Sequence, residues 1–309
     1  MPRNTRRSGR YLIGQTCECG CGEYTRGGRF LPGHDAKLKS ALLARARAGD
    51  TEAQAELERR GWARTGERRF GVEIEFFGCT SNTVIEAMRA QGLECDFYGY
   101  THRVLDTWKI VHDGSVGAEG LELVSPPLRG QVGFEALRKA CEALQTAGAK
   151  VDKTCGLHVH HEAKDLTKTI ALNLLTLYAD RKGTIESILA ASRRDNTYCR
   201  HYSTWELRDL GYNGTLRRAI SGLSRYRAIN LQSYPKYGTV EFRQHQGTTE
   251  FAKITAWIRF GQAMYKTAKQ QTAVGTDLVG MLQDFGLQED VAYWTRRQTY
   301  FARHAEAAD

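Results

Sequence analysis

The chain has 309 residues, of which 41% are hydrophobic and 26% charged, the composition of a soluble globular protein with one or two domains. No apolar run approaches the roughly 18–20 residues needed to span a bilayer, and the basic N-terminus leads into no apolar signal core, so we expect a cytoplasmic protein without a membrane partner. The net charge of +9 favours association with polyanions, although a soluble protein can be basic without binding one.

The first 67 residues divide by composition into three parts. We expect residues 1–15 to form a flexible basic tail, residues 16–36 a glycine- and cysteine-rich knot, and residues 37–67 a helical connector. Asp50 suits the N-cap of a second connector helix, because its carboxylate can accept a free backbone N–H there. Positive side chains in this region favour docking of a nucleic acid or a protein partner. They are Arg3, Arg6, Arg7, Arg10, Arg26, Arg29, Lys37 and Lys39.

Three cysteines crowd into five positions of the knot, namely Cys17, Cys19 and Cys21. With His34 they supply three soft ligands and one borderline ligand, which is the Cys₃His set of a structural Zn²⁺ site. Such a site would stabilise a segment that is too small to fold alone. The alternative is a reduced loop without metal, and the spacing is tighter than the usual Cys-x₂-Cys, so the ligand set stays open. The remaining cysteines are scattered through apolar segments and are expected to behave as small hydrophobes.

From residue 68 onward, the spacing of apolar residues predicts both strands and helices. Because the two do not alternate strictly, we predict an α+β fold with a mostly antiparallel sheet and flanking helices. The predicted strands are 68–77, 94–100, 105–112, 119–125, 151–161, 226–232 and 238–244. The predicted helices are 81–91, 131–147, 166–191, 251–272, 276–285 and 288–303.

Two predicted strands carry polar pairs on one face, because strand side chains alternate with period two. In the first strand, Glu73 and Glu75 point one way and apolar residues the other. Two neighbouring carboxylates repel each other, and a hard cation such as Mg²⁺ (or Mn²⁺) would remove that conflict. A solvated strand face is the alternative. Strand 151–161 places His158 and His160 on one face in the same way.

Further polar groups occur at three other places. Asp113-Gly-Ser115 is a turn signal, and Glu122 lies between two leucines in a strand that Pro126 and Pro127 end. Glu241 and Arg243 share one face of the last predicted strand. That pair could be a simple ion pair, but a carboxylate beside an arginine also suits a site that holds a metal and a phosphate. Acidic, imidazole and guanidinium groups on four strands together indicate a functional site.

Five motifs follow one another along the chain. They are Gly-Val-Glu-Ile-Glu-Phe at 71–76, Trp-Lys-Ile-Val-His-Asp-Gly-Ser at 108–115, Leu-Glu-Leu-Val-Ser-Pro-Pro-Leu at 121–128, Cys-Gly-Leu-His-Val-His at 155–160 and Val-Glu-Phe-Arg-Gln-His at 240–245. In this order they resemble the putative amidoligase family, which belongs to the glutamine synthetase / glutamate–cysteine ligase superfamily and has many phage-encoded members. The resemblance covers about 68–270 and implies a catalytic domain at 68–272, with a C-terminal helical extension at 273–309 and a host-cytoplasmic location if phage-encoded.

This resemblance implies a glutamine synthetase-like catalytic fold and an ATP-dependent ligase, in which ATP phosphorylates a carboxylate and an amine attacks the acyl phosphate. By motif position, Mg²⁺ would be held by Glu73, Glu75, Glu122 and Glu241. Catalytic roles would fall to Glu75, Asp113, His158 and Arg243. Nucleotide, phosphate or substrate contacts would come from Ser115, His160 and Arg243. Secondary candidates for binding anionic groups are Arg200, Arg227 and Asn230, and ordinary surface charge is the alternative for these arginines.

Two alternatives use the same residues differently. A metal-dependent phosphoesterase could use Asp113, the two histidines and the glutamates. A nucleic-acid-binding module could be built on a ligase-like scaffold, but such a module has no need of buried carboxylates. The motifs define neither the acid nor the amine, which could be small molecules or parts of a protein, peptide or nucleic acid.

Overall fold

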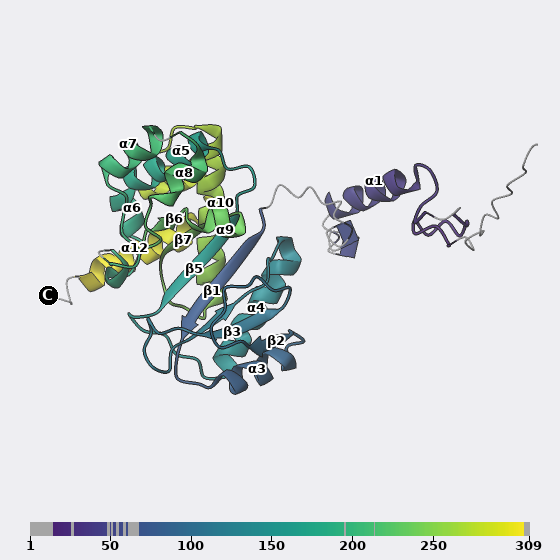
Figure 1. The fold of residues 1–309 in the computed structure, drawn as a ribbon, viewed down its shortest axis with the longest axis horizontal. Coiled ribbons are helices and arrows are strands. Elements are labelled where there is room, and N and C mark those ends of the chain that lie inside the picture. Colours follow the sequence, from purple (N-terminus) through teal and green to yellow (C-terminus); the bar gives the residue numbers. More distant parts are fainter. Residues whose placement is uncertain are drawn as a thin grey trace, which may run out of the picture. The chain divides into compact units, whose positions relative to one another are not determined.

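The computed structural model describes residues 15–25, 28–47, 50, 52–53, 56–57, 60, 68–194, 196–212 and 214–305. These fall into two compact units, Met1–Gly66 and Glu67–Asp309, which are taken separately below. Figure 1 shows the first unit in purple and the second from blue to yellow. The predicted tail, except Gln15, lies outside the described residues, as does Arg26.

The first unit contains a short hairpin followed by a helix. An antiparallel bridge between Thr16 and Tyr24 closes the hairpin, and helix α1 (His34–Arg47) begins three residues before the predicted connector. The Asp50 carboxylate accepts a hydrogen bond from the backbone N–H of Ala53 at 3.0 Å, as predicted for an N-cap. Residues 52–53 and 56–57 are helical. The buried apolar core of this unit, within the described residues, is small. It consists of Leu42, Ala53 and Leu57.

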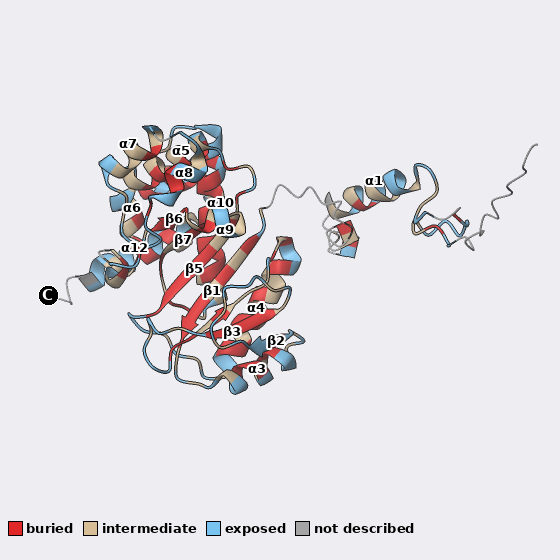
Figure 2. Cartoon of the chain, in the orientation of Figure 1, coloured by how far each residue is buried: buried red, intermediate tan, exposed pale blue. Residues whose placement is uncertain are grey.

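The second unit is built on a seven-stranded sheet with the order β2-β3-β4-β1-β5-β7-β6. Its neighbouring strands are antiparallel except β2 and β3, so the predicted α+β class with a mostly antiparallel sheet is confirmed. Figure 2 shows that the central strands are largely buried. The strands are β1 (Phe70–Phe76), β2 (Cys95–Phe97), β3 (Trp108–His112), β4 (Leu121–Val124), β5 (Gly156–Glu162), β6 (Ile229–Asn230) and β7 (Thr239–Gln246).

Helices cover the apolar face of this sheet. Val72, Ile74 and Phe76 of β1 are almost fully buried in the core. Helix α10 (Phe251–Gln270) packs on β5 and on the helices α4 (Gly130–Thr146) and α5 (Lys168–Asp180), and α3 (Ser81–Ala90) packs on α4 and β2. This arrangement leaves the Glu73/Glu75 face of the sheet free of that helical layer.

The C-terminal segment joins the same core. It contains α11 (Leu278–Asp284), a 3₁₀ turn at Gln288–Asp290 and α12 (Val291–Ala305). Trp294 is fully buried and its ring lies 6.4 Å from that of Trp257 in α10. Among the described residues, no helix combines the length and the apolar character needed to cross a membrane.

Several predicted boundaries were wrong for local reasons. The predicted helix 166–191 ends at Asp180, because Arg181 leaves helical geometry and its guanidinium donates to the carbonyls of Val274 and Gly275. A short helix α6 (Lys182–Glu186) and a 3₁₀ turn (Ala191–Arg193) follow it. The predicted strand 226–232 reduces to two residues. Three helices were not predicted: α7 (Thr204–Tyr212), α8 (Leu216–Ser221) and α9 (Ser233–Tyr237).

Candidate active site

The strand register places the polar residues of the sheet next to one another. In each antiparallel pair, a residue on the open face lies directly opposite a residue on the neighbouring strand, so that their side chains can meet. The opposed pairs are Glu75 with Glu122 between β1 and β4, Glu73 with His158 between β1 and β5, and His160 with Glu241 between β5 and β7. Four strands therefore contribute to one polar surface at the centre of the sheet.

His158 lies at the middle of four carboxylates. Its Nδ1 is 3.2 Å from Glu73 Oε2, 3.6 Å from Glu241 Oε1 and 3.9 Å from Glu122 Oε1. Its Nε2 is 3.4 Å from Glu75 Oε1. An imidazole has at most two N–H donors and one positive charge, so it cannot neutralise four carboxylates. The cluster therefore holds an excess of negative charge that the histidine does not compensate.

Two of these carboxylates are held in place by neutral or positive groups of the chain. The backbone N–H of Gly156 donates to Glu75 Oε2 at 2.5 Å. The side-chain amide of Asn230 donates to Glu241 Oε2 at 2.7 Å, and the Arg243 guanidinium donates to the other oxygen of Glu241. Glu75 and Glu241 are both almost fully buried, so these hydrogen bonds fix their orientation.

The charges in the cluster shift its pKa values in opposite directions. Burial raises the pKa of Glu122 well above its usual range, and repulsion from Glu73 and Glu75 adds to this shift. Burial also opposes ionisation of Glu73, but attraction to His160 and His158 outweighs it and holds the pKa of Glu73 well below its usual range. Glu73 is thus stabilised as a carboxylate, while burial and repulsion disfavour the ionised form of Glu122, and a bound metal ion would reduce this repulsion.

The two histidines that follow Val159 differ in surroundings. His160 Nδ1 pairs with Thr239 Oγ1 at 2.9 Å, while its buried Nε2 lies 3.3 Å from Glu73 Oε1 without hydrogen-bond geometry. Burial opposes protonation of His160, but Glu241 and Glu73 raise its pKa. His161 points to the apolar face, where burial lowers its pKa to about 3, so it packs as a neutral ring.

The turn after β3 brings a fifth carboxylate to the cluster. Asp113 Oδ1 accepts hydrogen bonds from the backbone N–H and the hydroxyl of Ser115, both at 2.7 Å, which fixes the turn. Oxygens of Asp113, Glu75 and Glu122 lie within 4.8 Å of one another. A second group at the same spacing contains Glu73, His160 and Glu241.

These two groups share no residue, so the face could hold two cations at once. A third group of the same spacing combines members of both. It consists of Glu73, Glu122 and His158. Carboxylate oxygens with an occasional imidazole are the ligands of a hard divalent cation such as Mg²⁺ or Mn²⁺.

A cavity of about 240 Å³ adjoins the Glu73 end of the cluster. Glu73, Glu122 and His160 form its polar floor. Apolar side chains and positive side chains share its walls. The apolar ones include Phe70, Val104, Leu105 and Pro127, and the positive ones are Arg69, Arg103, Lys109 and Lys164.

Two predicted anion-binding residues lie outside the carboxylate cluster. Arg200 and Arg227 line a separate surface hollow and are joined by a parallel bridge. The Arg227 guanidinium is already paired with Glu206 of α7 and donates to the carbonyl of His201 at 3.1 Å. Of the residues predicted for phosphate or substrate contacts, Arg243, Asn230, His160 and Ser115 therefore lie at the cluster, and Arg200 and Arg227 do not.

Sequence reasoning missed two positive residues at the site. The Arg193 side chain is buried, with 3% of the residue exposed, and its Nη2 donates to the carbonyl of Arg243 at 2.7 Å. Its buried Nε has no hydrogen-bond partner in the described part of the chain. A Cβ on Gly156 would lie only 3.1 Å from Arg193 Nη2 and from His158 Nε2, so the glycine lets both side chains approach the strand closely. Lys109 is 5% exposed and donates to the carbonyls of Thr101 and Arg103. Its place beside Glu122, on the same face, was available from strand alternation.

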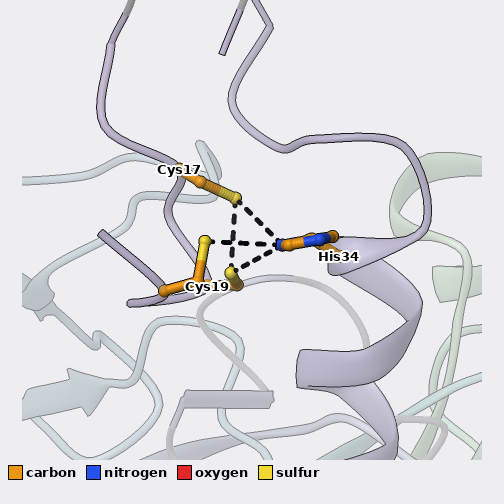
Figure 3. Close-up of side chains that lie close together, drawn as sticks. Cys17, Cys19 and His34 are labelled. Atoms are coloured by element: carbon orange, nitrogen blue, oxygen red, sulfur yellow. Dashed lines mark hydrogen bonds between the residues drawn. The ribbon is translucent and has the colours of Figure 1, made fainter. Parts of the chain in front are cut away.

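The predicted zinc ligands lie in the first unit. The sulfurs of Cys17, Cys19 and Cys21 and the Nδ1 of His34 are all within 4.8 Å of one another. Figure 3 shows the side chains of Cys17, Cys19 and His34 turned toward one another. The donor set is compatible with zinc, and it contains none of the oxygen ligands that the sheet provides.

The second unit is thus a mixed α+β scaffold with a metal-compatible acidic site on its sheet. A family model described as "Putative amidoligase enzyme" matches residues 66–265, well over half of the 309 residues. The chain belongs to this family, as the sequence motifs predicted, and the family description indicates a ligase-type enzyme. No curated protein matches the chain.

Proposed function

We propose that this chain is an ATP-dependent carboxylate–amine ligase on a glutamine synthetase-like catalytic fold, which forms an amide through an acyl phosphate. The observation that carries the proposal is the array of carboxylates and imidazoles on one sheet face in a chain of the amidoligase family. Phosphoryl transfer requires mainly positioning and charge neutralisation, and this face concentrates the ligands for both.

The residues present fit divalent metal ions. Burial and repulsion from Glu73 and Glu75 raise the pKa of Glu122 although Lys109 lies on the same face, and within the described residues the buried Nε2 of His160 makes no hydrogen bond. Glu73, His160 and Glu241 would hold one ion, and Glu75 and Glu122 a second, with Asp113 at its edge. Bound Mg²⁺ would neutralise the phosphate oxygens during transfer.

The cavity beside Glu73 suits the nucleotide. Its apolar walls can cover a base, while Lys109 and Arg103 provide positive charge near its acidic floor. His160 lines the cavity and belongs to the carboxylate cluster, so an ion that it holds with Glu73 and Glu241 would lie beside the nucleotide phosphates. We therefore place the triphosphate between this cavity and the centre of the sheet.

The opposite end of the face suits the acid substrate. Arg243 and Arg193 bring two guanidinium groups to the region of Glu75 and Gly156, where the missing Cβ lets the Arg193 side chain approach the strand. Guanidinium groups orient a carboxylate for attack on the γ-phosphate and stabilise the charge of the acyl phosphate that results. His158 lies between the two ends and would position Glu73 and Glu75 for both steps.

The attacking amine must lose a proton as the amide forms. Asp113 is the carboxylate on the turn at the edge of the cluster, with one oxygen fixed by Ser115. We assign it as the base that accepts this proton, because a fixed carboxylate within reach of the acyl carbon can act without rearrangement. Inorganic phosphate then leaves with the electrons of the broken acyl–oxygen bond.

Hydroxylamine tests this proposal without knowledge of the natural amine. With ATP, Mg²⁺ and a mixture of the common amino acids and dicarboxylic acids, the intact chain should release ADP and accumulate hydroxamate. The Glu75→Ala variant should do neither. Hydrolysis of phosphoesters in the absence of ATP, abolished by the same variant, would instead indicate a metal-dependent phosphoesterase.

A further inference from the structure

The apolar core of the first unit, within the described residues, is too small to account for its fold. The core comprises Leu42, Ala53 and Leu57, with Leu38, Leu43 and Ala46 packed around it. These residues belong to the helical segments, and the hairpin at 15–25 contributes only Cys17 and Thr25 as buried side chains. A segment with so little burial among its described residues ordinarily needs a metal or disulfides to fold.

The donor atoms of the hairpin have the separations of a tetrahedral zinc site. Zn–S bonds of about 2.3 Å and a Zn–N bond of about 2.0 Å place sulfurs roughly 3.7 Å apart, and sulfur and nitrogen roughly 3.5 Å apart. The Cys17 and Cys19 sulfurs are 3.3 Å apart. His34 Nδ1 lies 3.8, 3.2 and 3.5 Å from the sulfurs of Cys17, Cys19 and Cys21, respectively (Figure 3).

The backbone is built to present these atoms. The N–H of Cys17 donates to the carbonyl of Glu23 at 2.7 Å, which closes the hairpin around the cysteines. Gly20 and Gly22 have φ values of +83° and +80°, a conformation that costs side-chain-bearing residues free energy, and they turn the chain after Cys19 and Cys21. Gly33 has φ +78° and directs His34 back over the sulfurs at the start of α1.

A second contact shows that the Cys17 sulfur is placed as a ligand. The backbone N–H of Leu31 donates to this sulfur at 3.4 Å, and Cys17 itself is 2% exposed. Such N–H contacts orient metal-bound thiolates and offset their charge. Disulfide bonding does not account for the cluster, because all of its cysteines are free and an odd number of them faces one histidine.

We infer that Cys17, Cys19, Cys21 and His34 bind one Zn²⁺ that holds the hairpin and the start of α1 together, independently of the acidic site on the sheet. The soft donor set selects zinc over Mg²⁺, whereas the carboxylates of the second unit have the reverse preference. With four protein ligands the site has no open position, so the metal would be structural rather than catalytic.

Metal analysis of the full-length chain, produced without a histidine tag in zinc-supplemented medium, tests this inference. We expect one zinc per chain, and most of it lost in Cys19→Ser. Cys79→Ser is the matched control, because this free cysteine lies in the other unit, and it should keep the zinc. Zinc-free wild-type protein, or undiminished zinc in Cys19→Ser, would overturn the assignment.

Histidine replacement separates ligation from simple unfolding. His34→Cys supplies a fourth thiolate and should retain one zinc, while His34→Ala should lose it. Replacement of zinc by Co²⁺ should give the intense visible bands of a tetrahedral thiolate site in the wild type, with a shift in His34→Cys. Equal zinc content in both His34 variants, or cobalt bands that are the same in the wild type and in His34→Cys, would contradict His34 as a ligand.

Discussion

The two ligand clusters of this chain differ in what supports them. The cysteines lie on a hairpin and His34 at the start of α1, in a unit whose buried apolar core, within the described residues, is Leu42, Ala53 and Leu57, so hydrophobic packing contributes little to their positions. The glutamates and histidines lie on four strands whose opposite face is packed under helices in an extensive core. The first cluster should therefore depend on metal for its fold, and the second should keep its fold and depend on metal for activity.

Metal removal should give the largest difference between the two units in their sensitivity to protease. A zinc-selective chelator should make residues 15–60 sensitive to protease, because a structural zinc contributes on the order of 10 kcal/mol to such a fold. Residues 68–305 should stay resistant, since their core does not involve the metal. Limited proteolysis followed by mass spectrometry measures both responses in one sample, and the comparison fails if the two regions become sensitive together.

Loss of a carboxylate from the sheet should have the reverse effect. Glu75→Ala should lower ATP-dependent turnover by about 10³-fold, or about 4 kcal/mol, with little change in the thermal unfolding midpoint. Glu86→Ala is the matched control, because Glu86 is exposed on α3 away from the cluster. Full activity of Glu75→Ala in the hydroxamate assay would remove Glu75 from the metal site.

Crowding of carboxylates predicts a stabilising substitution. The pKa of Glu122 is raised in the folded state, so its contribution to stability is present below its unfolded pKa of about 4.3 and is lost as pH rises. In metal-free buffer at pH 7, Glu122→Gln should therefore raise the free energy of unfolding by about 1 kcal/mol. Added Mg²⁺ should stabilise the wild type more than the variant in urea titrations, and equal stabilisation would argue against Glu122 as a ligand.

Asp165 provides the opposite case, a carboxylate whose cations belong to the chain. Hydrogen bonds from Arg68 hold its pKa well below the usual range against the effect of burial, and Lys269 contributes further. Its contribution to stability is present above the unfolded pKa of about 3.9 and is lost as pH falls below it. Because the pair is partly exposed, Asp165→Asn should cost only about 1 kcal/mol at pH 7. The difference from wild type should shrink toward pH 3, and a pH-independent difference would contradict this origin.

Local periodicity predicted the strands of the site and the faces on which Glu73, Glu75, His158 and His160 lie, because alternation is a property of a single strand. The register that sets Glu73 against His158 is a tertiary feature and could not be read from one strand. Arg193 was missed because it lies in a 3₁₀ turn just beyond the predicted helix 166–191, where no motif of the site was recognised.

The ion pair of Arg227 was not predicted, for a related reason. Its partner Glu206 lies on α7, one of the helices that were not predicted, so the ion pair could not be predicted from the sequence. Gly211 and Gly214 interrupt the helical spacing of that region. The roles assigned to the cluster residues stay predictions until they are measured.

Nucleotide binding tests the central claim most directly, because it requires neither the acid nor the amine. Isothermal titration with a non-hydrolysable ATP analogue should show binding in the presence of Mg²⁺ and none in its absence. Glu73→Ala should abolish this binding, and Cys19→Ser should leave it intact. Absence of Mg²⁺-dependent binding to the wild-type chain, or binding that Glu73→Ala leaves unchanged, would contradict an ATP-dependent ligase site on this face of the sheet.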